Sequence, residues 1–251
     1  MRRRGDDEPR HEGWMSESAS AAATAGFLGL VFVAFTLLAL DPLVGLDAYF
    51  NLNPPRESWV PALQLLDRVG QRAVCLPVLA VVAWACYERQ QSWRPVVLAV
   101  GSVFLLNLLV LLLKIGLGRG QPAPADPSFF IGGMAYPSGH TANIVLVYGL
   151  AVYLVGRNFG LRRSTRGWLW ATVGCLALLM VVVSVTLNWH WFADLIAGLL
   201  VGAVVLELTV AADAAMPRTA FDHGLRSGFD AVLTALRQWH RVPRPRSGNA
   251  L

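Results

Sequence analysis

Three short polar segments interrupt an otherwise apolar chain: KIGLGRGQP at 114–122, PSGH at 137–140 and NWHWFAD at 188–194. Polar side chains within or at the ends of long apolar segments are energetically costly, so they mark candidate functional sites. Their types suit chemistry on a phosphate group. Such chemistry needs cations that neutralise oxygens, and side chains that attack phosphorus or move protons.

The two histidines of these segments are the candidate reacting groups. His190 and Asp194 are four residues apart, so on a helix they share one face. The carboxylate can then fix the tautomer of the imidazole and stabilise the imidazolium. His140 supplies a second imidazole, so that one histidine can act as the nucleophile while the other donates a proton.

The remaining polar groups are suited to hold a phosphate. Lys114 and Arg119 can neutralise its oxygens. Ser138 adds a hydroxyl donor, and Gly139 lets the phosphate approach the free N–H groups at the start of a helix. Taken singly, such residues are also typical of a membrane interface, where Lys and Arg extend toward headgroups. Their joint arrangement favours a phosphate site, and the three cysteines show no metal-ligand spacing, so neither a metal nor a cofactor is predicted.

Composition indicates that these segments belong to a membrane protein. Of 251 residues, 55% are apolar and 15% are charged, against about 25% charged in an average soluble domain. Six apolar stretches are long enough to cross a bilayer as helices, so we expect an all-α bundle of six transmembrane helices over 22–212. The expected spans are 22–40, 66–87, 95–115, 138–156, 167–187 and 190–212. Pro, Asn and Gly predict irregular structure at 41–58 and 116–137.

The basic residues predict how the chain is oriented. With six spans, both tails and the loops 88–94 and 157–166 share one side, which carries 16 of the 21 Lys and Arg residues. That side is expected to be cytoplasmic, so the three polar segments face outside the cytoplasm. The tails, 1–21 (expected to be disordered) and 213–251, are expected to contact anionic lipid and not nucleic acid. The six spans and this orientation predict a multi-pass protein of the inner (plasma) membrane. Arginine in place of lysine everywhere except Lys114 is typical of a GC-rich bacterium.

The three motifs resemble the type 2 phosphatidic acid phosphatase (PAP2) superfamily of membrane lipid phosphatases, whose signature is K-x6-R-P, then P-S-G-H, then S-R-x5-H-x3-D. The resemblance implies a six-helix core that needs no metal. It further implies that His190 forms a phosphohistidine, that Asp194 orients it and that His140 protonates the leaving group. Two positions depart from the signature, because Gln121 and Ser184 stand where the family has phosphate-binding arginines. We expect Gln121 and Ser184 to contact the phosphate from these positions, although neither side chain replaces the charge or the bidentate geometry of a guanidinium.

The resemblance implies a lipid phosphatase at the outer face of the cytoplasmic membrane. Its candidate substrates are a polyprenyl phosphate or diphosphate, a prenyl-phosphosugar and a phosphatidate-type lipid. Two alternatives stay open. The missing arginines admit a phosphotransferase that passes a headgroup to an alcohol other than water, and a lipid-binding homologue without activity. A GxxxG pattern at Gly198 and Gly202 is suited to close helix packing within the bundle or between copies, so the oligomeric state is open.

Overall fold

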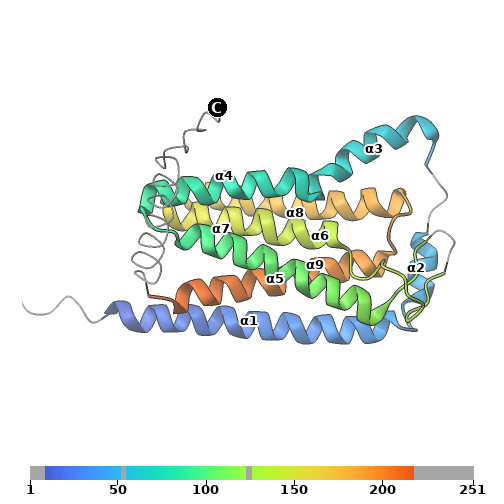
Figure 1. Cartoon of the computed structure of the whole chain (residues 1–251), viewed down its shortest axis with the longest axis horizontal. Coiled ribbons are helices and arrows are strands. Elements are labelled where there is room, and N and C mark those ends of the chain that lie inside the picture. The colour runs from blue at the N-terminus through green and yellow to red at the C-terminus, as the bar shows by residue number, and fades with distance from the viewer. Residues whose placement is uncertain (1–8, 52–54, 123–125, 218–251) are drawn as a thin grey trace, which may run out of the picture.

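The structure, a computed structural model, describes residues 9–51, 55–122 and 126–217, with side chains from Glu17 onward. These residues form a bundle of long helices without strands (Figure 1). In chain order the elements are α1 (Pro9–Ala39), α2 (Val44–Phe50), η1 (Glu57–Trp59), α3 (Val60–Asp67), η2 (Arg68–Gly70), α4 (Arg72–Gln90), α5 (Arg94–Leu117), α6 (Gly139–Asn143), η3 (Ile144–Tyr148), α7 (Gly149–Asn158), α8 (Arg163–Thr186) and α9 (Phe192–Ala215).

Six helical segments are long and apolar enough to cross a membrane, which confirms the expected all-α, six-span architecture. They are Glu17–Ala39, Glu57–Gln90, Arg94–Leu117, Gly139–Asn158, Arg163–Thr186 and Phe192–Ala215. Large apolar side chains such as Phe27, Leu30 and Phe104 are more than half exposed on the outside of the bundle. This arrangement is expected where the surrounding solvent is hydrocarbon and not water.

Two segments expected to be irregular are partly helical. The N-terminal tail, expected to be disordered over 1–21, is helical from Pro9, because Ala-rich sequence favours helix and because α1 packs along α9. Ser18 Oγ donates to the carbonyl of Ala211 at 3.0 Å and fixes this pairing near the start of the span. The stretch 41–58 contains the short helix α2, which is tied to α9 by a carboxylate described below. Of the expected C-terminal tail, 218–251 lies outside the described residues.

Small residues let α9 occupy the middle of the bundle. A Cβ atom at Gly198 would collide with the carbonyl of Ser138 and the hydroxyl of Thr141, and one at Gly202 would meet the Ala142 carbonyl at 2.6 Å. The GxxxG pair therefore brings α9 against α6 inside one chain. It sets the distance between the PSGH segment and the His190 segment.

The second span is bent where the chain passes from α3 through η2 to α4. Gly70 at the end of η2 lies so close to His140 that an added Cβ would stand 3.1 Å from the His140 Cβ. Asn143 Nδ2 donates to the Gly70 carbonyl at 3.2 Å and fixes the bend against α6. The bend consequently brings residues 67–73 to the PSGH segment.

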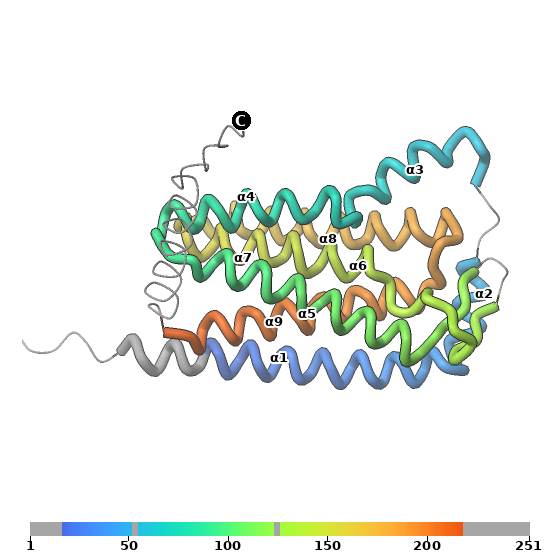
Figure 2. The backbone as a smooth tube through the Cα atoms, viewed as in Figure 1, coloured from blue at the N-terminus to red at the C-terminus, as the bar shows by residue number. Residues whose placement is uncertain are grey.

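The fourth span is also irregular, because a π-helical turn, η3, joins α6 to α7. The three pieces follow one continuous path in the chain trace (Figure 2).

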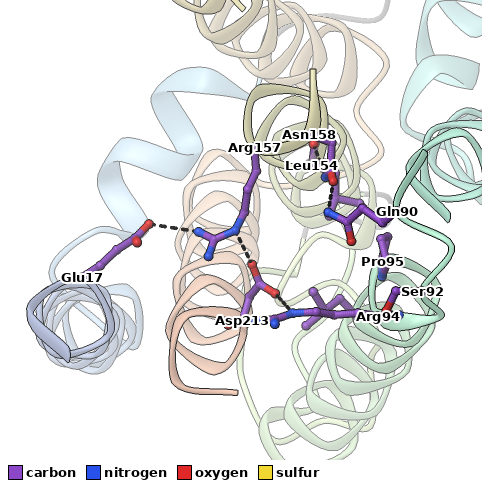
Figure 3. A pocket seen from close by; sticks show the side chains of 10 residues that line it. Glu17, Gln90, Ser92, Arg94, Pro95, Leu154, Arg157, Asn158 and Asp213 are labelled. Atoms are coloured by element: carbon purple, nitrogen blue, oxygen red, sulfur yellow. Dashed lines mark hydrogen bonds and ion pairs between the residues drawn. The ribbon is translucent and has the colours of Figure 1, made fainter. Parts of the chain in front are cut away.

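The two ends of the bundle differ in their polar groups. The end where α1 begins and α9 finishes carries an ion-pair network centred on Asp213, which pairs with Arg94 at 2.5 Å and Arg157 at 3.1 Å (Figure 3). Arg157 also reaches Glu17 at 3.3 Å. This network borders a cavity of about 620 Å³, and none of the described residues that line it is a histidine. The opposite end, where α5 finishes and α6 and α9 begin, holds the three polar segments (Figure 1).

Candidate active site

His190 and Asp194 meet at the start of α9. His190 Nδ1 lies 3.4 Å from Asp194 Oδ2, and the same oxygen accepts the Trp191 N–H at 3.0 Å. The helix begins at Phe192, so His190 precedes it and does not lie on its face as the spacing predicts. The contact forms all the same, because Asp194 turns back to cap its own helix. Its backbone carbonyl accepts the Ser138 N–H at 2.9 Å, which joins the second segment to the third.

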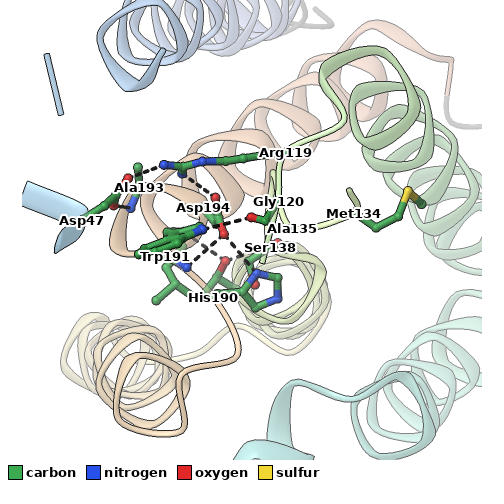
Figure 4. Close-up of polar contacts among 12 residues, drawn as sticks. Asp47, Arg119, Gly120, Met134, Ala135, Ser138, His190, Trp191, Ala193 and Asp194 are labelled. Atoms are coloured by element: carbon green, nitrogen blue, oxygen red, sulfur yellow. Dashed lines mark hydrogen bonds and ion pairs between the residues drawn. The ribbon is translucent and has the colours of Figure 1, made fainter. Parts of the chain in front are cut away.

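Asp194 is held from behind by a guanidinium. Arg119 Nη1 donates to Asp194 Oδ1 at 2.7 Å, and Nη2 forms an ion pair with Asp47 (Figure 4). Asp47 Oδ1 in turn accepts the Ala193 N–H at 2.8 Å. All three charged side chains are almost fully buried. Asp47, Arg119 and Asp194 therefore form a closed unit of net charge −1, and His190 contacts this unit through Asp194.

This position alters the expected role of Arg119. Its side chain is 0% exposed and lies behind Asp194, away from the cavity that His190 borders. The ring of Phe129 covers the guanidinium, with its centroid 4.7 Å from Cζ. Arg119 is not among the described residues that border the cavity, so its position does not support the expectation that it binds phosphate. Both carboxylates outcompete solvent for a guanidinium that is buried between them.

His140 has a carboxylate of its own. Its Nε2 lies 3.5 Å from Oδ2 of Asp67, the last residue of α3. Asp67 is fully buried, its other oxygen, Oδ1, has no hydrogen-bond partner among the described residues, and Gln71 Nε2 lies 3.4 Å from Oδ2. A buried carboxylate is stable only when it is paired, so Asp67 and His140 form a second His–Asp pair beside the first.

The motif spacing did not identify Asp47 or Asp67. Both lie outside the three polar segments, and no fixed distance along the chain relates them to His140 or Asp194. The one signal in the sequence is that each is a carboxylate near an apolar stretch. A carboxylate in such a place needs a cation or an imidazole as its partner.

A cavity of about 520 Å³ joins the two pairs. His140 and His190 both border it, with 30% and 14% of their side chains exposed. Of the residues predicted from sequence, Lys114, Gln121 and Gly139 border it as well. No Asp or Glu borders this cavity within the part of the chain described, so its lining favours an anion.

Lys114 and Gly139 are placed to contact a ligand in that cavity. Lys114 Nζ, in the last turn of α5, donates to the Met134 carbonyl and lies 3.5 Å from the Ala135 carbonyl. These contacts hold the Lys114 ammonium beside the end of the 116–137 segment, at the edge of the cavity. A Cβ at Gly139 would meet nothing within 4 Å, so this glycine leaves open space in front of the first turn of α6.

Two predicted phosphate ligands lie deeper than the cavity surface. Ser138 is fully buried and its Oγ has no hydrogen-bond partner among the described atoms. Ser184 is 1% exposed, lies 3.6 Å from the Met180 sulfur and does not border the cavity. The expectation that Ser184 contacts phosphate is therefore not supported by its position, because its side chain packs inside α8.

The groups beside the site are neutral or internally paired. Burial raises the pKa of Asp47, against the Ala193 N–H and the Arg119 guanidinium, which both lower it. Burial also raises the pKa of the Tyr136 phenol to about 12, and its hydroxyl lies 2.7 Å from Thr36 Oγ1. In the described parts of the chain, no cluster of three or more His, Cys, Asp or Glu side chains is placed to hold a metal ion.

Comparisons with known proteins show what this chain is similar to. Residues 95–215 match the sequence model of the PAP2 superfamily. The chain is 22% identical over 166 residues to phosphatidylglycerophosphatase B of Bacillus subtilis (strain 168), a match that covers 65% of this chain and 80% of the relative. Its fold matches the crystal structure of a transmembrane PAP2-type phosphatidylglycerolphosphate phosphatase from Bacillus subtilis with a TM-score of 0.65 at 19% identity, over 77% of this chain and 98% of that one. Residues 95–215 hold the three motifs in order around one cavity, and over these residues the chain matches the PAP2 superfamily.

Proposed function

We propose that this protein hydrolyses the phosphate ester or diphosphate of a membrane lipid in the cavity between His140 and His190. One observation carries the proposal. Two histidines, each backed by a buried carboxylate, border a single cavity that also presents Lys114. A nucleophile, a proton donor and a cation around one space are the groups that phosphoryl transfer requires.

We assign the nucleophile to His190, and its contact with Asp194 supports this role. Its Nδ1 faces Asp194, so with the proton on Nδ1 the lone pair of Nε2 is available. Nε2 attacks phosphorus and forms a P–N bond as the bond from phosphorus to the lipid oxygen breaks. The positive charge that develops on the ring is stabilised by Asp194, which the guanidinium of Arg119 holds in place.

The second pair handles the proton. Protonated His140 gives its proton to the departing lipid oxygen, which leaves as an alcohol or, from a diphosphate, as a lipid monophosphate. Neutral His140 then takes a proton from water as that water attacks the phosphohistidine. The P–N bond breaks, inorganic phosphate is released, and both histidines return to their starting states. Asp67 stabilises His140 in its charged form.

The expected orientation gives this reaction a location. The site lies at the end of the bundle opposite the Arg94–Asp213–Arg157 network (Figures 1 and 3). The excess of basic residues on that opposite side supports a cytoplasmic position for the network and an extracytoplasmic one for the site. The substrates proposed are polyprenyl phosphates or diphosphates, prenyl-phosphosugars and phosphatidate-type lipids. The names of the Bacillus subtilis relative and of the matched crystal structure add phosphatidylglycerophosphate to that group.

The test is phosphate release by the purified protein in detergent from a panel of these lipids, with wild type compared with His190→Ala. We expect release from at least one lipid and its loss in the variant. His223→Ala is the matched control, because His223 lies in the polar tail far from the motifs in sequence. Unchanged release by His190→Ala overturns the mechanism, and binding of a lipid without turnover by the wild type favours the inactive homologue.

The same site supports transfer to an alcohol as a second candidate. Gln121, which borders the cavity, is neutral where the family has a cation, so a neutral acceptor could lie there. Candidate acceptor alcohols added to the assay separate the two reactions. A new lipid product that depends on His190 indicates transfer, and phosphate release with no such product rejects it.

A further inference from the structure

Arg72 is a cation of the site that the motif spacing does not identify. We propose that Arg72 binds the phosphate group together with Lys114, in place of the arginines that are absent at positions 121 and 184. This inference rests on the proposed function and adds a phosphate ligand to it. It concerns a residue of α4, which lies outside all three motifs.

Local structure brings Arg72 to the cavity. The chain bends at η2, Gln71 is extended, and α4 begins at Arg72. Gly70, Gln71 and Arg72 all border the cavity that holds the two histidines. The positive end of the α4 dipole therefore faces the same space as the guanidinium, and both favour an anion there.

Arg72 also acts on the other charged groups of the site. Its charge is close enough to interact electrostatically with Lys114 and with His140. These three groups come from three separate segments, α4, α5 and α6, so they surround the cavity and do not form one surface stripe. A phosphate between them would contact all three segments.

The charges in the cavity leave Arg72 available for a ligand. Arg119 is neutralised by two carboxylates and is fully buried, whereas Arg72 is exposed and forms no ion pair with an acid in the described part of the chain. Among the described residues that border the cavity, two are cations, Lys114 and Arg72, and none is a carboxylate. The nearest carboxylates, Asp67 and Asp194, pair with the two histidines. A phosphomonoester carries a charge of about −1.5 to −2 near neutral pH, which two cations match.

The competing role for Arg72 is contact with bilayer headgroups. An exposed arginine at the end of a span reaches toward lipid phosphates without taking part in a reaction. The two roles differ in what a substitution changes. Substitution of a residue that contacts headgroups leaves the affinity of the site for inorganic phosphate unaltered. Substitution of a residue that binds the reacting phosphate lowers that affinity.

The experiment compares Arg72→Ala, Arg72→Gln and Arg72→Lys with Arg68→Ala. Arg68 is a nearby arginine in η2 that does not border the cavity, so Arg68→Ala is the matched control. Two measurements are made in detergent: kcat and KM for the best lipid phosphate, and the rise in melting temperature caused by inorganic phosphate. The measurement of melting temperature requires no turnover. Arg72→Gln keeps the side chain through Cδ but removes the charge, and it decides the question if Arg72→Ala is not folded.

We expect kcat/KM to fall about 10- to 100-fold in Arg72→Ala and Arg72→Gln, as loss of a charged hydrogen bond to phosphate predicts. The stabilisation by inorganic phosphate should shrink in the same variants. Arg72→Lys should retain part of both, and Arg68→Ala should match the wild type. Adding Gln121→Arg to Arg72→Ala should recover part of the loss, because position 121 borders the same cavity.

Wild-type kcat/KM and wild-type phosphate stabilisation in Arg72→Ala or Arg72→Gln overturn the inference. The proposed function fails separately. If His190→Ala retains activity, the mechanism is wrong whatever Arg72 does. If His190→Ala is inactive while the Arg72 variants equal the wild type, only the role of Arg72 is wrong.

Discussion

Replacement of Arg119 by Gln tests whether this arginine positions the triad or binds the substrate. The substitution removes one positive charge from the closed unit of Asp47, Arg119 and Asp194, which changes its net charge from −1 to −2. Two carboxylates are then left buried without a cation. Loss of one partner of a buried ion pair costs about 3–5 kcal/mol, so we expect the free energy of unfolding to fall by about that amount.

In Arg119→Gln the activity should also fall, through a lower kcat at a nearly unchanged KM. Asp194 loses the donor that holds Oδ1 and can turn away from His190. Loss of the carboxylate that orients a catalytic histidine costs up to about 10⁴-fold in kcat in a serine protease, so we expect a fall of at least about 100-fold here. KM should change little, because Arg119 lies outside the cavity.

Asp47→Asn is the matched comparison. It brings the unit to a net charge of 0, and an amide oxygen can still accept the Ala193 N–H. Its cost should be about 1–2 kcal/mol, and the double variant should be more stable than the sum of the two single effects predicts, by about 0.5–3 kcal/mol.

The assays for these variants are detergent unfolding followed by tryptophan fluorescence, and steady-state kinetics. Unchanged stability of Arg119→Gln, with a raised KM and an unchanged kcat, would show that Arg119 contacts the substrate and refute the reasoning.

Three further predictions concern the cavity and the helix contact that supports it. Gly139→Ala should fold normally and weaken substrate binding, because its Cβ enters open space in the cavity; a wild-type KM contradicts this. Gly198→Ala should lower the free energy of unfolding by about 1–3 kcal/mol, as overpacking does, and reduce kcat, because its Cβ pushes α9 away from Ser138; thermal unfolding at the wild-type temperature counts against it. The pH dependence of kcat/KM should be bell-shaped, because His190 must be neutral and His140 protonated; a flat profile from about pH 5 to 9 rejects this pairing of roles.

The sequence predicts the architecture well because a bilayer imposes a length on each helix. The six spans, the shared side of the polar segments and the packing of Gly198 all follow from apolar length, alternation across the membrane and residue size. Helix ends are less constrained, so α1 and α2 extend into stretches where irregular structure was expected.

The partners of the charged groups are harder to predict. Arg119 follows Lys114 in one motif, yet it turns inward because Asp47 and Asp194 together attract it more strongly than solvent does. Arg72 has no motif at all, and only the bend at η2 brings it to the cavity. Which cation faces a ligand and which supports a carboxylate is a property of the fold, since spacing along the chain does not determine distance between segments.

Direct detection of the covalent intermediate tests the central claim most sharply. Wild-type protein is mixed with a lipid substrate labelled with ³²P at its phosphate and quenched in alkali, where phosphohistidine survives, and the labelled residue is identified by mass spectrometry. The account predicts label on His190 and no label in His190→Gln. It also predicts that the label accumulates in His140→Ala with a diphosphate substrate, whose leaving group needs little protonation. Labelling of another residue, or equal turnover by His190→Gln, would contradict it.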